Sequence, residues 1–325
     1  MRKSGVFATI LLCSVISSAP QLALGQEWPT KPISWVVPFP PGGTADLMAR
    51  MIAPELAKAV GQPVIVENRA GASARIAAEH VANAAPDGYT LLQCGVGQFA
   101  INPSLYAKLS YDPIKDFAPI TVLAAVDNVM VVTPSLPVKT VQDFVRYAKE
   151  RPGQVNFTSS GVGSITHLTG ELMKRQAGFE MTHVSYKGSA PAAIDTISGV
   201  VQAMFDNLPG SLANIKAGKL KPLATLSRER SAALPDVPTL HESGFPDFDM
   251  VAWQCVAAPD GTPKAIVDRL NREIVTIIKS EAVTEKFRGL GARVVGNSPE
   301  AFGEYLRAET AKWSAAAADA GIEPQ

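Results

Sequence analysis

The chain has 325 residues, of which 46% are apolar and 18% are charged, and its 30 basic residues balance 30 acidic ones. A chain of this length and composition can bury substantial cores and is expected to form two domains. The near-neutral balance, without runs of like charge, argues against a nucleic acid or an anionic membrane as partner, because both require a basic patch.

The N-terminus has the build of a secretory signal peptide. Arg2 and Lys3 supply positive charge, an apolar stretch of 11 residues follows over 6–16, and residues 23–25 read Ala-Leu-Gly. An uncleaved anchor is the alternative, but the apolar stretch falls well short of the ~20 residues that a transmembrane helix needs. We expect cleavage after Gly25 and export to the periplasm. Removal of 25 residues from 325 leaves 300, with 28 basic and 30 acidic side chains, a net charge of −2.

Short β-branched runs alternate with longer helical patterns along the rest of the chain. This alternation predicts βαβ units and mainly parallel sheets. Thr140 and Ser164 stand where helix N-caps are expected. The expected strands are 33–37, 63–67, 89–92, 129–132, 154–158, 182–185, 200–205, 220–226 and 250–257, and the expected helices are 45–60, 74–84, 164–177, 263–280 and 299–320, with one more beginning at 140.

The order of these elements predicts an α/β fold of two lobes, each with a mainly parallel sheet flanked by helices. The chain is expected to build one lobe, cross out near 124–128, build a second lobe, and return through a turn-rich stretch between 227 and 251. Residues 26–126 and 252–325 would then form lobe 1 and residues 127–251 lobe 2, with a cleft between them.

Four turns are expected to join strand ends to helix starts, at residues 38–46, 95–98, 159–166 and 205–210. In open α/β sheets, ligands bind beyond the carboxyl ends of the strands. Glycine lets the backbone approach a ligand closely, and the first amides of a helix suit an anion. The alternative for each loop by itself is an ordinary tight turn, but four such loops at one edge favour a binding site.

None of these loops contains Lys or Arg, so none is a P-loop. Gly161-Val162-Gly163 begins like a dinucleotide fingerprint, but Thr166 stands where the third glycine would be. Loops of neutral amides and hydroxyls suit a single carboxylate better than a pyrophosphate, and we expect no cofactor.

An enzyme is the alternative from another class. Ser164 and His167 would share one helix face, and Asp206 would approach from another strand end, but the G-x-S-x-G pattern of a hydrolase elbow is absent. The histidines are scattered without a metal-ligand spacing, so we expect no metal site. Cys94 and Cys255 would remain after cleavage, either as buried free thiols or as a disulfide, and the sequence leaves both open.

Ten segments resemble the Bug-type receptors, the solute-binding components of tripartite tricarboxylate transporters. The opening Trp-Pro-Thr-Lys-Pro-Ile and the run Val-Pro-Phe-Pro-Pro-Gly-Gly-Thr-Ala-Asp carry the likeness first. Together the segments span nearly the whole mature chain: 28–33, 37–46, 61–64, 66–69, 85–91, 102–106, 183–188, 204–207, 234–239 and 258–263.

The resemblance implies a type II periplasmic binding protein fold, a monomer that closes on its ligand, and the membrane permease subunits of such a transporter as partners. It implies that Phe39 packs on the ligand, that Gly43 and Thr44 offer amides or a hydroxyl, and that Asp46 caps its helix or orders water. The other ligand-binding residues that it implies are Gly97, Gln98, Ser160, Gly163, Thr166 and, across the cleft, Asp206.

One segment departs from the family pattern. Such receptors usually read Pro-Gly-Ala-Gly-Gly-Asn-Ile-Gly after Asn68-Arg69, whereas residues 70–77 here read Ala-Gly-Ala-Ser-Ala-Arg-Ile-Ala. Our hypothesis is that Arg75 clamps a second, distal carboxylate, because a guanidinium binds one bidentately. The alternative is a solvated surface arginine.

The predicted function is therefore a periplasmic solute-binding protein without catalytic activity. Its ligand would be a small carboxylate: an aliphatic di- or tricarboxylate, an amino acid or an aromatic carboxylate. A hydrolase acting on carboxylates in the same fold remains the alternative.

Overall fold

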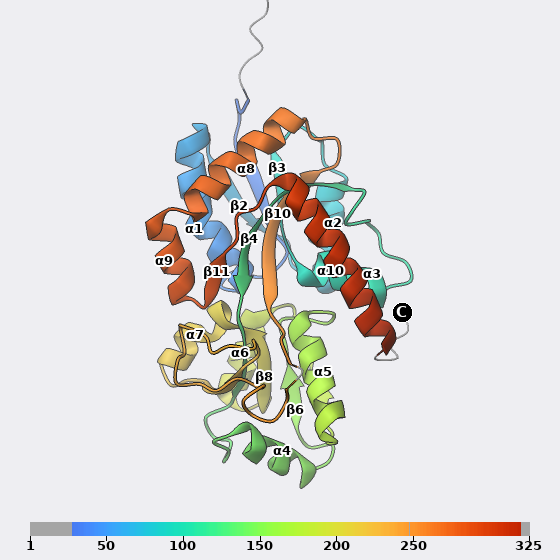
Figure 1. Cartoon of the computed structure of the whole chain (residues 1–325), viewed down its shortest axis with the longest axis vertical. Coiled ribbons are helices and arrows are strands. Elements are labelled where there is room, and N and C mark those ends of the chain that lie inside the picture. Colours follow the sequence, from blue (N-terminus) through green and yellow to red (C-terminus); the bar gives the residue numbers. More distant parts are fainter. Residues whose placement is uncertain (1–27, 247, 320–325) are drawn as a thin grey trace, which may run out of the picture.

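A computed structural model of the chain describes residues 28–246 and 248–319. The expected signal peptide, residues 1–25, lies outside the described residues. Two sheets follow one another along the long axis of the molecule, each with its own helices (Figure 1). In the described part of the chain, no helix combines the length and the apolar character needed to cross a bilayer.

The first sheet has six strands in the order β11-β4-β10-β3-β1-β2. Its strands are β1 (Ile33–Val37), β2 (Val64–Asn68), β3 (Thr90–Gly95), β4 (Phe117–Val126), β10 (Ala252–Pro259) and β11 (Ala292–Val294). The elements around it are α1 (Thr44–Val60), the 3₁₀ turn η1 (Ala72–Ala74), α2 (Arg75–Ala82), the π-helix η2 (Gly97–Ile101), α3 (Asn102–Leu105), α8 (Lys264–Ile278), α9 (Glu281–Gly289) and α10 (Pro299–Asp319).

The second sheet has five strands in the order β7-β6-β8-β5-β9. They are β5 (Asn128–Val132), β6 (Asn156–Thr158), β7 (Thr182–His183), β8 (Ala203–Asn207) and β9 (Lys221–Thr225). Its helices are α4 (Val141–Lys149), α5 (Ile165–Ala177), α6 (Ser189–Ser198) and α7 (Leu208–Lys216). The chain enters this sheet through Asp127, directly after β4, and leaves it after β9 to return through β10.

The predicted α/β class is confirmed, and the sheets combine parallel and antiparallel pairs. β1 runs parallel to β2 and β3, and β6 runs parallel to β7 and β8. The antiparallel strands are those that start at the boundary between the sheets. β5 starts there with Asn128 opposite Asn207 at the end of β8, and β10 starts there with Ala252 opposite Val126 at the end of β4.

Local sequence signals account for several helices. Met48, Ile52 and Leu56 recur every four residues on α1 and are fully buried, as expected from the apolar spacing. Thr140 caps α4 in a reciprocal capping box with Asp143, and the Ser164 side chain caps α5. β4 was not among the expected strands, because a buried apolar run without alternation resembles a helix segment as much as a strand.

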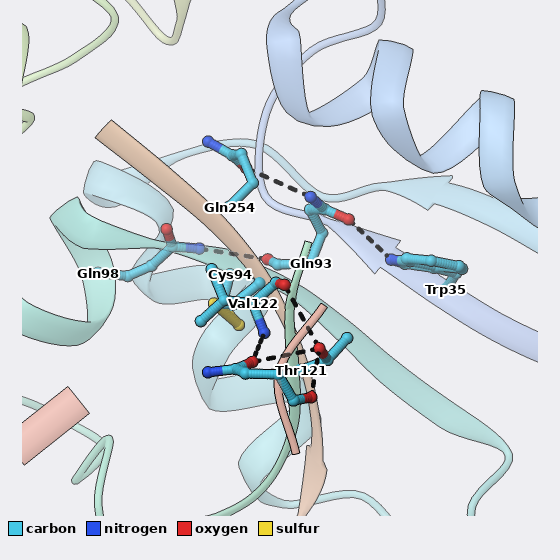
Figure 2. Close-up of a disulfide and its surroundings, with 9 residues drawn as sticks. Trp35, Gln93, Cys94, Gln98, Thr121, Val122 and Gln254 are labelled. Carbon is cyan, nitrogen blue, oxygen red and sulfur yellow. Dashed lines mark hydrogen bonds between the residues drawn. A yellow bond between two sulfur atoms is a disulfide. The ribbon is translucent and has the colours of Figure 1, made fainter. Parts of the chain in front are cut away.

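A disulfide joins Cys94 to Cys255. The two residues face each other on β3 and β10, which are antiparallel neighbours (Figure 2). The pairing that the sequence left open is thus settled, and a disulfide suits the oxidising compartment predicted from the N-terminus. It ties the returning strand to the first third of the chain across a sequence separation of 161 residues.

Replacing both cysteines by alanine should lower the free energy of unfolding by about 2–4 kcal/mol, because the cross-link restricts the unfolded chain. Urea denaturation followed by circular dichroism measures the loss. The control is wild-type protein denatured in the presence of a reductant. Its folded state lacks the cross-link but keeps both cysteine side chains in the core. Equal stability of the oxidised, reduced and double-alanine proteins would contradict this role.

Candidate functional site

A cavity lies at the boundary between the two sheets and contains about 490 Å³ of atom-free space, part of it open to solvent. Each of the four loops expected to carry the site contributes at least one lining residue, and the η1 turn and β10 contribute others. The lining residues are Phe39, Ser73, Ala74, Gly95, Val96, Gly97, Gln98, Asn102, Ser160, Gly161, Val162, Gly163, Ser164, Ile165, Asn207, Ala252 and Gln254.

The structure brings together five of the expected site residues in the cavity wall: Phe39, Gly97, Gln98, Ser160 and Gly163. Six others do not line it: Gly43, Thr44, Asp46, Arg75, Thr166 and Asp206. Several of these six hold the loops in place, as the following contacts show.

Asp46 braces the loop between β1 and α1. Its carboxylate accepts hydrogen bonds from the Gly42 amide, Arg50 Nε and Asn68 Nδ2, each at 2.9 Å. Burial opposes ionisation, but the bonds from Arg50, Gly42 and Asn68 and the Arg50 charge outweigh it and lower the pKa of Asp46. Asn68 Nδ2 also donates to the Phe39 carbonyl at 2.9 Å. The ionised carboxylate thus fixes the backbone that presents Phe39 to the cavity.

Thr166 organises the loop between β6 and α5. Its buried hydroxyl accepts from the Ser160 amide at 3.2 Å and lies 2.8 Å from Ser160 Oγ and 2.9 Å from Ser164 Oγ. Ser164 Oγ donates to the Gly161 carbonyl at 2.6 Å. These bonds fold the loop back on itself so that residues 160–165 face the cavity.

Two histidines pack behind the same loop. The rings of His167 and His183 lie 4.1 Å apart between centroids. The Gly163 amide donates to His167 Nδ1 at 3.3 Å, and His183 Nε2 lies 2.9 Å from Ser159 Oγ. Burial lowers the pKa of His167, and burial together with the charges of His167 and Lys174 lowers the pKa of His183 to about 3. Both rings are therefore neutral at neutral pH.

Asp206 lies outside the cavity wall and is fully buried. Ser189 Oγ donates to its carboxylate at 2.5 Å and Ser211 Oγ at 2.6 Å. Burial raises the pKa of Asp206 to about 6, against the opposing effect of these hydrogen bonds. A Cβ built on Gly210 would lie 3.1 Å from Asp206 Oδ2 and 3.4 Å from Thr44 Oγ1, so the carboxylate sits where α1 meets the second sheet.

The triad required by the hydrolase alternative is not assembled. The Ser164 hydroxyl bonds the Gly161 carbonyl, the Thr166 hydroxyl and the His167 backbone amide, while the His167 ring accepts from the Gly163 amide. Asp206 is held by serine hydroxyls rather than by a histidine. Within residues 28–246 and 248–319, no group of His, Cys, Asp and Glu side chains is placed to hold a metal ion.

Hydrogen bonds link Trp35 through Gln93 to Gln254 (Figure 2), and Gln254 lines the cavity. Trp35 Nε1 donates to Gln93 Oε1 at 3.1 Å, and Gln93 Nε2 donates to Gln254 Oε1 at 3.3 Å. An indole N–H can only donate, so it fixes the direction of every amide that follows. Gln254 therefore presents its NH₂ group, and a Cβ built on Gly95 in the cavity wall would lie 3.4 Å from that nitrogen.

Arg75 turns towards Tyr106. Its Nε donates to the Ala72 carbonyl at 3.0 Å, and its guanidinium carbon lies 4.3 Å from the centre of the Tyr106 ring. The preceding turn carries three non-glycine residues with positive φ: Ala72 at 47°, Ser73 at 54° and Ala74 at 71°. L-residues adopt this conformation at a cost of about 1–2 kcal/mol each.

Five polar residues of the cavity wall were not among the expected ligand-binding residues: Ser73, Asn102, Ser164, Asn207 and Gln254. Two of them lie beside sequence signals that could have found them. Asn207 directly follows Asp206 in one of the four expected loops, and Asn102 begins an Asn-Pro pair, which is typical of a turn. Gln254 lies within a strand pattern, and its role depends on which strands β10 joins, which its own sequence does not show.

The model of the Tripartite tricarboxylate transporter family receptor matches residues 48–322 of the chain. The chain belongs to this family. BugT from Bordetella pertussis is 38% identical to this receptor over 297 residues, which cover 91% of each chain.

Two solved structures extend the likeness to the fold. Rpa4515 of R. palustris with adipate is 41% identical, covers 92% of this receptor and 100% of its own chain, and gives a TM-score of 0.89. MatC from Rhodopseudomonas palustris with bound malate is 33% identical, covers 88% and 99%, and gives a TM-score of 0.84. The expected two-lobed periplasmic binding protein fold of the Bug type is thus confirmed.

The buried histidines should make the receptor less stable in mild acid. The unfolded chain binds a proton at each histidine near pH 6.5, whereas folded His183 resists protonation down to about pH 3. The unfolded state thus gains protons first, and the free energy of unfolding falls as the pH drops between these values. For His183 the slope should be below about 1 kcal/mol per pH unit, because the side chain is partly exposed.

Urea denaturation of wild type and His183→Gln at pH 7, 6 and 5 measures this slope. Asp206 works in the opposite direction below about pH 6, so the difference between the two proteins isolates the histidine. His80→Gln, which removes an exposed histidine from α2, is the matched control. A His183→Gln slope as steep as that of wild type would contradict the expectation.

Proposed function

We propose that the receptor captures a small carboxylate in the periplasm and delivers it to the membrane permease subunits of a tripartite tricarboxylate transporter. The observation that carries this proposal is the amide of Gln254, a residue of the cavity wall whose oxygen accepts from Gln93, so that its NH₂ group is the end available as a donor. A fixed donor in a cavity between two lobes suits an anionic oxygen.

The neutrality of the wall supports a carboxylate over a phosphate. Among the described residues that line the cavity, none carries a charge. The first amides of η2, at Gly97 and Gln98, have no acceptor within their own helix and add further donors. Polar donors without a cation suffice for one carboxylate, whereas a phosphate usually draws on Lys or Arg. The relatives that hold adipate and malate agree with this class of ligand.

Within this proposal, Phe39, Gly97, Gln98, Ser160 and Gly163 contact the ligand, since all five line the cavity. Asp46 and Thr166 act by bracing the two loops, Thr44 and Asp206 lie where α1 meets the second sheet, and Gly43 is the N-cap residue of α1. Residues 26–126 and 252–325 form lobe 1 and residues 127–251 form lobe 2 of a monomer. The signal peptide is cleaved after Gly25, and the receptor performs no catalysis.

Binding is tested first by thermal shift of the mature receptor against carboxylates, with neutral sugars as the contrast. A ligand that binds the folded state raises the melting temperature by mass action. We expect at least one carboxylate from the aliphatic or aromatic series to do so. A shift with sugars and none with carboxylates would overturn the proposal.

Gly163→Ala should reduce the affinity for such a carboxylate by roughly tenfold or more, as expected for about 1.4 kcal/mol or more of lost binding. Its Cβ would lie 2.9 Å from Asn102 Oδ1 and 3.0 Å from Leu105 Cδ1, so the wall must shift. Gly153→Ala is the matched control, because Gly153 has φ of 73° against 74° for Gly163 but nothing within 4 Å of its Cβ position. Calorimetry should show unchanged affinity for the control, and equal losses would contradict the assignment.

Arg75 is proposed to clamp the distal carboxylate of a longer ligand by leaving its position on Tyr106. Arg75→Ala should then weaken adipate or succinate roughly tenfold more than a monocarboxylate of similar length, since only the diacids lose a bidentate partner. Calorimetry on both ligand classes measures the ratio, and Arg69→Ala, which removes an exposed arginine nearby, is the control. Equal losses for both classes, or none, would contradict this role.

A further inference from the structure

The amide of Asn102 has an acceptor that the receptor itself leaves unused. Asn102 begins α3, lines the cavity and is almost fully buried. Among the described residues, its Oδ1 is buried without a hydrogen-bond partner. A buried acceptor without a partner destabilises the folded state, so such an oxygen in a residue of the cavity wall calls for a physical explanation.

The orientation of this amide is fixed by its nitrogen. Asn102 Nδ2 donates to the Ser73 carbonyl at 3.1 Å and to Tyr111 Oη at 3.3 Å. A carbonyl can only accept, and the Tyr111 hydroxyl donates its hydrogen to the Gln98 carbonyl at 2.7 Å. Both partners therefore require the nitrogen, and exchanging the two ends of the amide would lose both bonds.

Oδ1 consequently faces the loop between β6 and α5. A Cβ built on Gly163 would lie 2.9 Å from this oxygen, so the glycine directs an α-hydrogen towards it. Such a hydrogen is a weak donor and does not replace an N–H or O–H. The Gly163 amide itself donates to His167 Nδ1. Neither lobe supplies a strong donor to Asn102 Oδ1.

We propose that Asn102 Oδ1 accepts a hydrogen bond from a hydroxyl or ammonium group that the ligand carries beside its carboxylate. The preferred ligands are then hydroxy- or amino-carboxylates. This inference rests on the proposed carboxylate function and narrows it. Gln254 offers a hydrogen-bond donor to the ligand's carboxylate, and Asn102 offers an acceptor to the hydroxyl or ammonium group beside it. Malate carries a hydroxyl and adipate does not, so the two relatives do not distinguish hydroxy-carboxylates from plain diacids as ligands of this receptor.

The test uses ligands that differ by one donor group. Calorimetry on the mature receptor measures the dissociation constants of succinate, malate and aspartate, and of phenylacetate and mandelate. The member of a set with a hydroxyl or ammonium should bind roughly tenfold more tightly, because a site that pairs a buried group discriminates against the analogue that leaves it unpaired. Malate and aspartate together show which donor the oxygen accepts.

Asn102→Leu removes the acceptor at similar volume and should bring the ratio within each set close to one. Tyr106→Phe is the matched control. It removes the hydroxyl that donates to Ser73 Oγ at 3.2 Å, and so loosens the same turn while Asn102 stays in place. The control should keep the wild-type ratio. Asn102→Ala serves as a second variant should the leucine protein fail to fold, since the ratio in either one carries the test.

The two levels of the proposal fail differently. If no carboxylate binds the wild type, the proposed function fails. If carboxylates bind but the matched ligands bind equally, or if the ratio survives in Asn102→Leu, the role of Asn102 is overturned while the proposed function stands. A water that satisfied the oxygen in every complex would produce this second result.

Discussion

The site depends on the insertion of β10 between β3 and β4. This strand returns from the second sheet and pairs antiparallel with both neighbours, which places Gln254 opposite Gly95 at the end of β3 and Ala252 opposite Val126 at the end of β4. Without that insertion the cavity would lack one wall, and the Gln93 amide would lack its partner. The disulfide lies one residue further along the strand, at Cys255, and holds the same register covalently. The strand by which the chain returns to the first sheet thus also completes the site.

The polarity of the cavity wall comes from the fixed orientation of side-chain amides and not from net charge. An indole in the core can only donate, so the amide chain that it starts ends in a donor. A carbonyl at Ser73 can only accept, so the Asn102 amide that it binds turns its nitrogen to Ser73 and leaves its buried oxygen without a hydrogen-bond partner among the described residues. Fixed dipoles of this kind act more strongly inside a protein than on its surface, because the effective dielectric constant is lower there. A neutral wall can therefore distinguish the two ends of a small polar ligand.

Much of the fold follows from local signals in the sequence, and the remainder depends on pairing between distant segments. The apolar spacing of α1 and the caps at Thr140 and Ser164 are local, and the structure reproduces them. The convergence of four loops followed from the rule that strand ends share an edge. The positions of β4, Gln254 and the disulfide depend on contacts between segments far apart in the sequence, 161 residues for the disulfide, and a single sequence carries no local pattern for such contacts.

The loop around η1 departs from the family pattern in sequence, but the role of its residues depends on contacts with distant side chains. Serine and alanine stand at positions 73 and 74, where the family pattern has glycine, and the structure shows both residues in the left-handed region. Such strain persists only where neighbours hold it in place. Asn102 Nδ2 donates to the Ser73 carbonyl and Tyr106 Oη donates to the Ser73 hydroxyl, so the residue that carries the unused acceptor also secures the strained turn. A loop held in this way before the ligand arrives loses less conformational entropy on binding, and the strain is therefore consistent with a preorganised wall.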